Sequence, residues 1–357
     1  MKISSERFKD GVAKVVKGAG FNKLIPLTSM VGLKLKDGNL TILATDMTNS
    51  VAVVLDKVSG DDFDITIDAD KFSKLVSKIT SEEITLEITD NVLVIKAGGT
   101  YKLPLIADED GLVVFPNIEL VDMPNEVMLT SILQAYNINK PALAKTMERP
   151  ELTGYYCGER VISTDGCVIT FSNFNLLNSP SPMLISSRMV DLLALCKDEK
   201  IKWGYNSKRE ELVFGTSDYF VVGPMLPGIE DYPADAICAY LDEAFPSSCK
   251  LPKELMLNVL DRLSLFIDAY DKNGAYFTFT RTGLNIHSKK DASTEVVNYV
   301  ESNDFEPFNC LVDIPMLKEQ IASNPNDTIK LHYGNENALK LEAGNTIQVI
   351  SLLEDEE

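Results

Sequence analysis

The chain is poor in the residue types on which most catalytic and metal sites depend. Only two histidines, His287 and His332, occur in 357 residues, and neither has a neighbour at the spacing of metal ligands. We expect both to be polar residues of strands. The sequence holds no P-loop, no HExxH helix and no GxSxG turn, so no nucleophile and base can be paired. We therefore expect a protein that is not an enzyme and that uses no metal and no cofactor.

Paired cysteines and long apolar runs are also missing. The six cysteines are scattered, without a Cys-x-x-Cys pair, which favours reduced thiols over disulfides or a zinc site. No window approaches the roughly 18 unbroken apolar residues of a membrane helix, and the first ten residues, MKISSERFKD, lack the apolar core of a signal peptide. We expect a cytoplasmic protein that does not contact a membrane.

Positive charge is scarce overall, with 34 Lys and Arg against 53 Asp and Glu and a net charge of −19. A uniformly acidic surface would argue against nucleic acid, because duplex binding depends on neutralisation of phosphates by Lys and Arg. The acidic run Asp108-Glu109-Asp110 could be read as metal carboxylates. It has no accompanying motif, so we interpret it as a solvated acidic loop.

The sequence contains a pattern of strands and turns that repeats along the chain. Residues 151–169 predict a hairpin, with strands over 152–157 and 161–163, followed by a Thr164-Asp165-Gly166 turn. Similar hairpins occur over 32–46 and 275–288. The turn glycines Gly38, Gly158 and Gly283 are 120 and 125 residues apart, and Asp46 and Asp165 are 119 apart, which is one third of 357. This period predicts three copies of one domain, and the two aspartates are then turn residues.

Six segments predict helices, each directly after a short strand. Their starts lie near residues 4, 128 and 252 and near 68, 186 and 313. Ser4, Asp68, Ser186 and Asp313 can cap four of them, and Pro252 suits the start of another. Short alternating runs between the helices predict strands with one buried face. Each third of the chain therefore predicts a strand–helix–three-strand unit twice, an α+β fold, with domains over 1–122, 123–242 and 243–357.

The scarce positive charge is concentrated in these helical segments. Residues 1–23, 68–80, 129–149, 186–202, 250–262 and 313–323 sum to +8, which leaves −27 on the rest of the chain. Lysines on solvated helix faces are one explanation. Because the bias toward positive charge is shared by six repeated helices, it favours a second explanation, a helix face that binds a polyanion.

Three tandem domains with basic helices and an acidic remainder resemble the bacterial β sliding clamp, the processivity subunit of DNA polymerase III. The similar stretches are LIPLTSMVGLKLKDGNLTILATDMTNSVAV over 24–53, RPELTGYYCGERVISTDG over 149–166, and LPGIEDYP over 226–233. The resemblance implies a head-to-tail homodimer closed into a ring, which encircles double-stranded DNA without reading its sequence. It also implies a groove for peptides of the replicative polymerase, the clamp loader and other partners. The alternative is a clamp-like peptide-binding hub that does not encircle DNA.

The resemblance also implies site residues, transferred by position. The side chains expected to face DNA are those of Lys9, Lys14, Lys17, Lys23, Lys71, Lys74, Lys78, Lys140, Lys145, Arg149, Arg188, Lys197, Lys200, Lys253, Arg262 and Lys318. The implied partner groove comprises Leu152, Thr164, Gly166, Ile169, Val349, Ile350, Ser351 and Leu352. The implied dimer interface pairs Tyr101 with Phe266 and Ile267.

Two features depart from the family pattern. After the Thr-Asp-Gly turn the family commonly has His-Arg, whereas this chain has Cys167-Val168. The family usually ends soon after its last apolar strand, whereas four acidic residues, 354–357, follow Leu353 here. Both departures lie beside the implied groove, so we expect them to affect the choice of partner.

Overall fold

The computed structural model describes residues 1–109, 111–173, 177, 179, 181–241, 243–268, 273–290 and 292–354. Asp110 of the acidic run and residues 355–357 of the acidic tail lie outside the described residues. The chain divides into two compact units. Unit 1 comprises Met1–Thr130 and Arg188–Met225, and unit 2 comprises Ser131–Ser187 and Leu226–Glu357. No helix among the described residues has the length and apolar content needed to cross a membrane.

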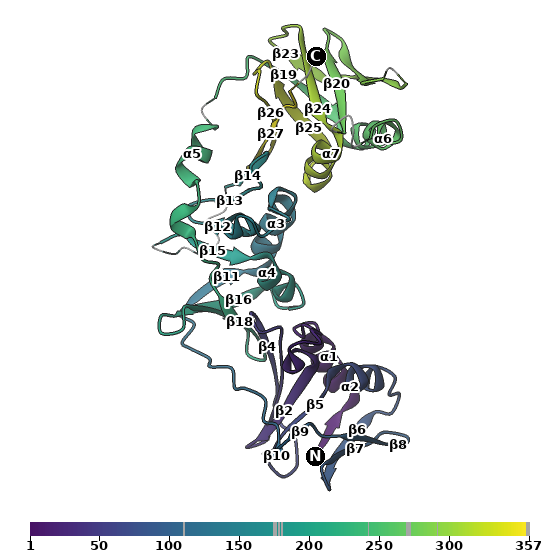
Figure 1. The fold of residues 1–357 in the computed structure, drawn as a ribbon, viewed down its shortest axis with the longest axis vertical. Coiled ribbons are helices and arrows are strands. Elements are labelled where there is room, and N and C mark those ends of the chain that lie inside the picture. Colours follow the sequence, from purple (N-terminus) through teal and green to yellow (C-terminus); the bar gives the residue numbers. More distant parts are fainter. Residues whose placement is uncertain are drawn as a thin grey trace. The chain divides into compact units, whose positions relative to one another are not determined.

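Unit 1 is built on an eight-stranded antiparallel sheet (Figure 1). Its strands, in spatial order, are β11 Asn125–Met128, β16 Lys200–Asn206, β17 Glu211–Gly215, β18 Tyr219–Pro224, β4 Ser50–Leu55, β3 Asn39–Thr45, β2 Met30–Lys36 and β5 Phe63–Asp68. At the centre, β4 pairs with β18, so that Val51 lies opposite Val221 and Val53 lies opposite Tyr219. We call this pairing of distant parts of the chain the first seam.

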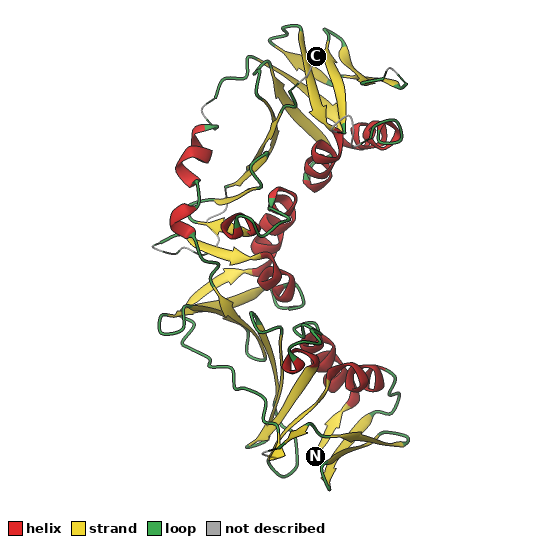
Figure 2. Ribbon diagram, in the orientation of Figure 1, coloured by secondary structure: helices red, strands yellow, loops and turns green. Residues whose placement is uncertain are grey.

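A four-stranded sheet and the helices complete unit 1. The sheet has the order β1 Lys2–Ser4, β6 Glu83–Thr89, β7 Val92–Lys96 and β8 Thr100–Pro104. The helical segments are α1 Ser5–Val16, α2 Ala69–Ser77, α4 Ser187–Leu193, which enters unit 1 at Arg188, and the 3-10 turn η1 Pro26–Ser29. A short ribbon consists of β9 Ala107–Asp108 and β10 Gly111–Leu112. Figure 2 shows α1 and α2 on the same side of the strands. The rings of Phe8 and Phe72 meet edge to face between these helices at 5.9 Å.

Unit 2 repeats this plan with a nine-stranded sheet. Its strands, in spatial order, are β15 Met183–Ser186, β12 Gly154–Cys157, β13 Val161–Thr164, β14 Val168–Ser172, β27 Thr346–Ser351, β26 Ala338–Ala343, β25 Thr328–Tyr333, β19 Ser247–Pro252 and β23 Glu301–Asn303. The central pairing of β14 with β27 places Val168 opposite Ile350 and Thr170 opposite Gln348. We call this pairing the second seam.

The remaining elements of unit 2 are a four-stranded sheet and its helices. The sheet has the order β22 Thr294–Asn298, β21 Gly283–Ser288, β20 Gly274–Phe279 and β24 Phe308–Asp313. The helices are α3 Leu129–Asn139, which enters unit 2 at Ser131, α5 Ala234–Ala239, α6 Lys253–Leu263 and α7 Ile314–Ser323. Three 3-10 turns are η2 Lys140–Ala142, η3 Pro150–Thr153 and η4 Ile229–Asp231.

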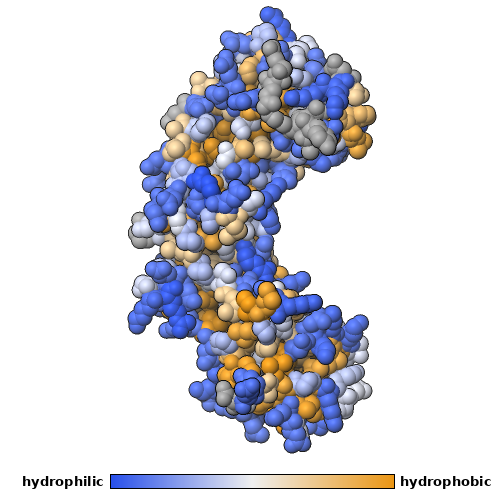
Figure 3. All heavy atoms as spheres, viewed as in Figure 1, coloured by the Kyte–Doolittle hydropathy of each residue, from blue (hydrophilic) through white to orange (hydrophobic). Residues whose placement is uncertain are grey.

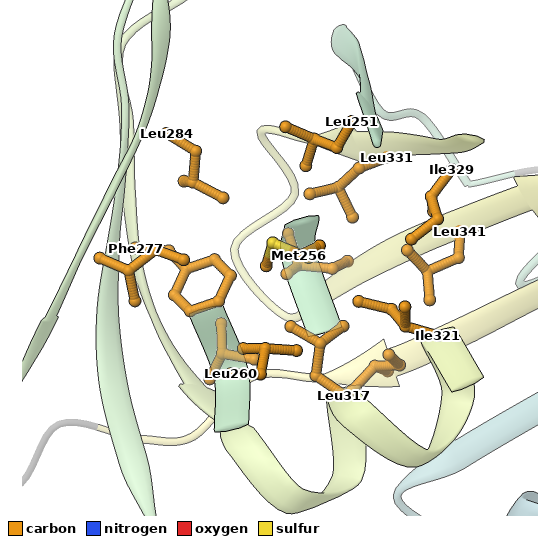
Figure 4. Close-up of a cluster of buried hydrophobic side chains, with 14 of the residues drawn as sticks. Leu251, Met256, Leu260, Phe277, Leu284, Leu317, Ile321, Ile329, Leu331 and Leu341 are labelled. Carbon is orange, nitrogen blue, oxygen red and sulfur yellow. The ribbon is translucent and has the colours of Figure 1, made fainter. Parts of the chain in front are cut away.

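Helices α6 and α7 cover a large apolar core in unit 2. Figure 4 shows Met256 and Leu260 of α6 and Leu317 and Ile321 of α7 directed toward side chains of the strands. All four are at most 2% exposed. This burial follows from the spacing of apolar residues every three or four positions along each helix.

The second seam differs from the first by a buried polar layer. Gln348 of β27 donates to Gln320 Oε1 of α7 at 2.9 Å and to Ser323 Oγ at 3.0 Å. Gln320, Gln348 and Thr170 are each at most 1% exposed. Because buried polar groups need partners, these bonds tie α7 to the strand pairing beneath it.

The predicted α+β fold, with repeated strand–helix–three-strand units, is confirmed. Helices begin where the sequence places them, and Asp68 and Asp313 each accept a backbone N–H at 2.8 Å as caps. Three helices end earlier than predicted. α1 stops at Val16, α3 at Asn139 and α4 at Leu193. Glycines follow α1, and Pro141 follows α3 closely, and both residue types favour helix ends.

The hairpin over 151–169 is present, with one difference. Leu152 lies in the 3-10 turn η3, not in the strand, because Pro150 fixes the backbone at the start of that turn. The turn after β13 is built as predicted. Asp165 Oδ1 accepts the N–H groups of Cys167 and Val168 at 2.8 Å each, and Gly166 has φ +96°. Asp46 accepts two backbone N–H groups in the corresponding turn.

Candidate functional sites

The sixteen cations predicted to face DNA differ in whether a carboxylate already neutralises them. Nine form ion pairs. Asp10, for example, accepts from both Lys14 and Lys197 at 2.8 Å, and these two lysines hold the pKa of that carboxyl below its usual value. The other paired cations are Lys74, Lys145, Arg149, Arg188, Lys200, Arg262 and Lys318. More than half of the sixteen candidate cations are therefore already neutralised by carboxylates of the described residues.

Six of the remaining seven cations form no ion pair with a carboxylate among the described residues. Two of these six are bound to carbonyl oxygens, Lys9 to that of Ile79, and Lys253 to those of Ala322 and Asn324 at the end of α7. The seventh cation, Lys140, contacts the Tyr136 hydroxyl. The four others are exposed and have no side-chain partner among the described residues: Lys17, Lys23, Lys71 and Lys78. We call these four the free lysines. All of them belong to unit 1.

Several of these cations lie beyond the helices that the sequence assigned to them. Lys23 follows α1 in the loop before η1, and Lys145 and Arg149 follow α3 in the loop between η2 and η3. Lys197 follows α4, and Lys200 is the first residue of β16. The cationic segments are therefore helix ends and the loops that follow them, as well as helix faces.

The implied partner groove coincides in part with a pocket of about 770 Å³ in unit 2, which we call the large pocket. Its lining consists of Gly166, Cys167, Ile169, Tyr240, Glu336, Asn337, Ala338, Val349, Ser351, Leu352, Leu353 and Glu354. Five of the eight predicted groove residues are among them. The volume suits a site for a small ligand or a short segment of chain.

The three other predicted groove residues lie beneath the surface. Leu152 is 2% exposed in an apolar cluster with Val349, and Ile350 is fully buried in the core under α7. Thr164 is 3% exposed and its hydroxyl donates to the Val168 carbonyl at 2.6 Å. Alternation along a strand explains Ile350, because its side chain points to the opposite face from that of Val349.

Sequence reasoning missed residues of the pocket that come from other segments. Tyr240 follows α5, and Glu336, Asn337 and Ala338 lie between β25 and the start of β26. A second pocket of about 390 Å³, the adjoining pocket, shares Glu336, Leu352 and Leu353 with the first. No local motif could reveal these contributors, because only strand pairing brings them to the loop after β13.

Two of the three predicted interface residues lie at exposed positions. Tyr101, in the edge strand β8, is 40% exposed, and Phe266, just after α6, is 49% exposed. Ile267 is half-buried against the core of unit 2. Sequence reasoning missed Leu265, at 79% exposure, and Val296 in the edge strand β22, at 59%. Figure 3 shows hydrophilic side chains over most of the visible surface, with apolar ones in patches between them.

The described residues contain no group of three or more His, Cys, Asp and Glu side chains that could hold a metal ion. The two histidines lie on strands, as expected. His332 contacts Glu342 at 2.9 Å, and the His287 ring stacks on Tyr276. Burial raises the pKa of the Cys157, Cys249 and Cys310 thiols to about 12, so these thiols stay protonated at neutral pH.

Comparison with known proteins supports the resemblance drawn from the sequence. Residues 1–118 match the family model of the DNA polymerase III beta subunit, N-terminal domain. No curated protein matches the chain. Solved structures of low sequence identity match over nearly the full length. Those of the DNA polymerase sliding clamp from Bacillus subtilis and the DNA polymerase III beta chain from Streptococcus pneumoniae have TM-scores of 0.86 and 0.88 at 16% and 14% identity, each covering 99% of both chains.

These matches define the class of the fold. Over its whole length the chain has the fold of the bacterial DNA polymerase sliding clamps. The DNA polymerase III beta subunit from Thermotoga maritima, at TM-score 0.84, 16% identity and 99% coverage of both chains, gives the same result. Residues 1–118 form an N-terminal domain of the DNA polymerase III beta subunit type. The resemblance predicted from the sequence is confirmed.

Proposed function

We propose that this protein is a DNA sliding clamp, a non-catalytic processivity factor of DNA replication that acts in the cytoplasm. Two chains close head to tail into a ring around double-stranded DNA. The ring tethers the replicative polymerase, the clamp loader and other partners through the groove at the second seam. The three domains are 1–122, 123–242 and 243–357. The alternative of a hub that does not encircle DNA is not favoured, because the likeness to clamps extends over 99% of the chain.

The repeated seam carries this proposal. At the first seam the fourth strand of the first domain, β4, pairs with the last strand of the second domain, β18. At the second seam the fourth strand of the second domain, β14, pairs with the last strand of the third domain, β27. The same rule leaves two strands to be joined: β22, the fourth of the third domain, and β8, the last strand of the four-stranded sheet of the first domain.

A second copy of the chain supplies the missing partners. β8 and β22 are edge strands of their four-stranded sheets, and exposed edges with apolar side chains invite pairing. A seam between β8 of one copy and β22 of another would be equivalent to the two seams within the chain. Two such seams close a ring, in which the surface around Tyr101, Leu265, Phe266 and Val296 becomes buried.

The distribution of charge supports a sliding contact with DNA. Carboxylates of the described residues neutralise nine of the sixteen candidate cations, and the chain carries −19 overall. Contact with phosphates through few free cations gives weak binding without base readout. Such a ring holds the duplex by enclosing it, and the duplex can slide through.

The oligomeric state tests the proposal. In sedimentation velocity, we expect the wild-type protein to sediment at twice the chain mass of 39.5 kDa. Val296→Glu places a charge in the new seam and should shift the protein toward monomer. Val114→Glu is the matched control, since Val114 is 58% exposed and lies outside the edge strands. A stable wild-type monomer would contradict the proposal.

A further inference from the structure

Among the described residues, carboxylates and no cation line the two pockets beside the second seam. Glu336 lines both pockets, and Glu354 lines the large one. None of the residues that line either pocket is Lys or Arg. Neither glutamate has an ion-pair partner among the described residues, in contrast to most of the candidate DNA-facing cations. No described residue of the chain therefore compensates the charge of Glu336 and Glu354 through an ion pair.

A third carboxylate adds to this charge. Asp165 lies next to Gly166 in the turn after β13, and its donors among the described residues are the backbone N–H groups of Cys167 and Val168. Burial raises the pKa of the Cys167 thiol in the large pocket, and the charge of Asp165 adds to this effect. The pKa of the Asp313 carboxyl is likewise raised, first by burial and further by Glu319 and Asp165. Two separate groups thus respond to the negative charge at this end of β13.

Nearby lysines are engaged elsewhere. Lys340 of β26 lies over the Phe245 ring, with 4.7 Å between its Nζ and the ring centroid. Lys145 pairs with Glu319 at 3.2 Å. Neither lysine lines the large pocket or the adjoining pocket, so the carboxylates of the groove stay available to a cation that a partner brings.

The same pockets offer apolar contacts along a continuous path. Leu352 and Leu353 line both pockets. Ile169 and Val349 add apolar surface in the large pocket, and Tyr276 and Phe308 do so in the adjoining one. A short extended peptide could place apolar side chains in both pockets and pass Glu336 between them.

We propose that this groove selects peptides that carry Lys or Arg beside their apolar anchors, and that Glu336 and Glu354 are the residues that select them. The inference rests on the proposed partner-binding function of the groove and names the chemical class of the partner. An acidic peptide would face like charges here, and DNA would be repelled for the same reason. Exposed ion pairs contribute little each, so two of them should give a preference of about fivefold.

The preference can be measured with matched peptides. Three fluorescently labelled peptides share one apolar core of Leu and Phe and differ only in flanking residues, which are Lys, Gln or Glu. Fluorescence anisotropy with the full-length protein should give an affinity about fivefold higher for the Lys peptide than for the Gln peptide, and lowest for the Glu peptide. Added salt should reduce the differences, because it screens exposed charges.

Charge-neutral variants locate the effect. Glu336→Gln with Glu354→Gln should remove the preference for Lys and leave the affinity for the Gln peptide unchanged. Glu254→Gln is the control, since this exposed residue lies on α6, which lines neither pocket. Equal affinities for all three peptides, or a persistent preference in the double variant, would overturn the inference and leave the groove intact. Failure of every peptide to bind would instead count against the partner groove of the proposed function.

Discussion

The free lysines allow the contact with DNA to be dissected quantitatively. Replacement of all four, Lys17, Lys23, Lys71 and Lys78, by Gln removes the candidate cations whose side chains have no partner among the described residues. Each lost phosphate contact lowers the slope of log K against log salt by about 0.9. If each of the four touches a phosphate, the slope should fall by about 3 to 4 per chain. The assay is anisotropy of a labelled duplex at several salt concentrations.

Two controls separate local contact from overall charge. Lys74→Gln with Asp70→Asn, combined with Lys318→Gln and Asp261→Asn, removes two ion pairs at constant net charge. The slope should change by less than about 1, because these lysines are already neutralised. The second control removes four exposed lysines of strands and a turn: Lys2, Lys36, Lys202 and Lys208. Equal slopes for the free-lysine variant and the wild type, or an equal loss in either control, would refute the reasoning.

Three further predictions concern stability and the groove. Gly32→Ala should lower the free energy of unfolding by about 1–3 kcal/mol in urea titration, because the Cβ of the new alanine would lie 2.4 Å from the Cβ of the buried Phe115. An unchanged urea midpoint would contradict the packing of residues 113–118 on β2. Gln348→Leu should lower the free energy of unfolding by about 1–3 kcal/mol in the same assay, because Gln320 and Ser323 lose a buried hydrogen-bond donor. A more stable variant would show that the polar layer does not stabilise the second seam. With iodoacetamide at about pH 8, mass spectrometry should find the exposed Cys167 labelled first. Cys157, Cys249 and Cys310 should stay unlabelled until the protein unfolds, because their pKa of about 12 keeps these thiols protonated. A bound peptide should slow the labelling of Cys167, and an unchanged labelling rate would place the peptide elsewhere.

Local features of the fold could be predicted because local chemistry determines them. The caps Asp68 and Asp313 and the turn at Asp165 and Gly166 depend on neighbours within a few residues. The recurrence of such turns at a period of one third of the chain is the basis for expecting three domains, which stays a prediction. The predicted helix ends were less accurate, because positively charged residues continue past Asn139 into a loop and so do not mark where the helix ends.

The seams and the state of the cations could not be predicted from the sequence. The pairing of β4 with β18 joins residues more than 160 positions apart, and no local pattern indicates it. Whether a lysine is free depends on a carboxylate from another segment, as with Lys145 and Glu319. The acidic groove was hidden for the same reason, because Glu336 reaches the pocket only through the sheet.

Retention on DNA of different topology tests the central claim most directly. The protein is loaded on a nicked circular plasmid and the complex is isolated by gel filtration at a salt concentration that suppresses direct binding. We expect the protein to remain with circular DNA and to be lost within minutes once a restriction enzyme linearises it, since a closed ring slides off free ends. Equal retention on circular and linear DNA, or no retention on either, would contradict the proposal that this chain forms a ring around the duplex.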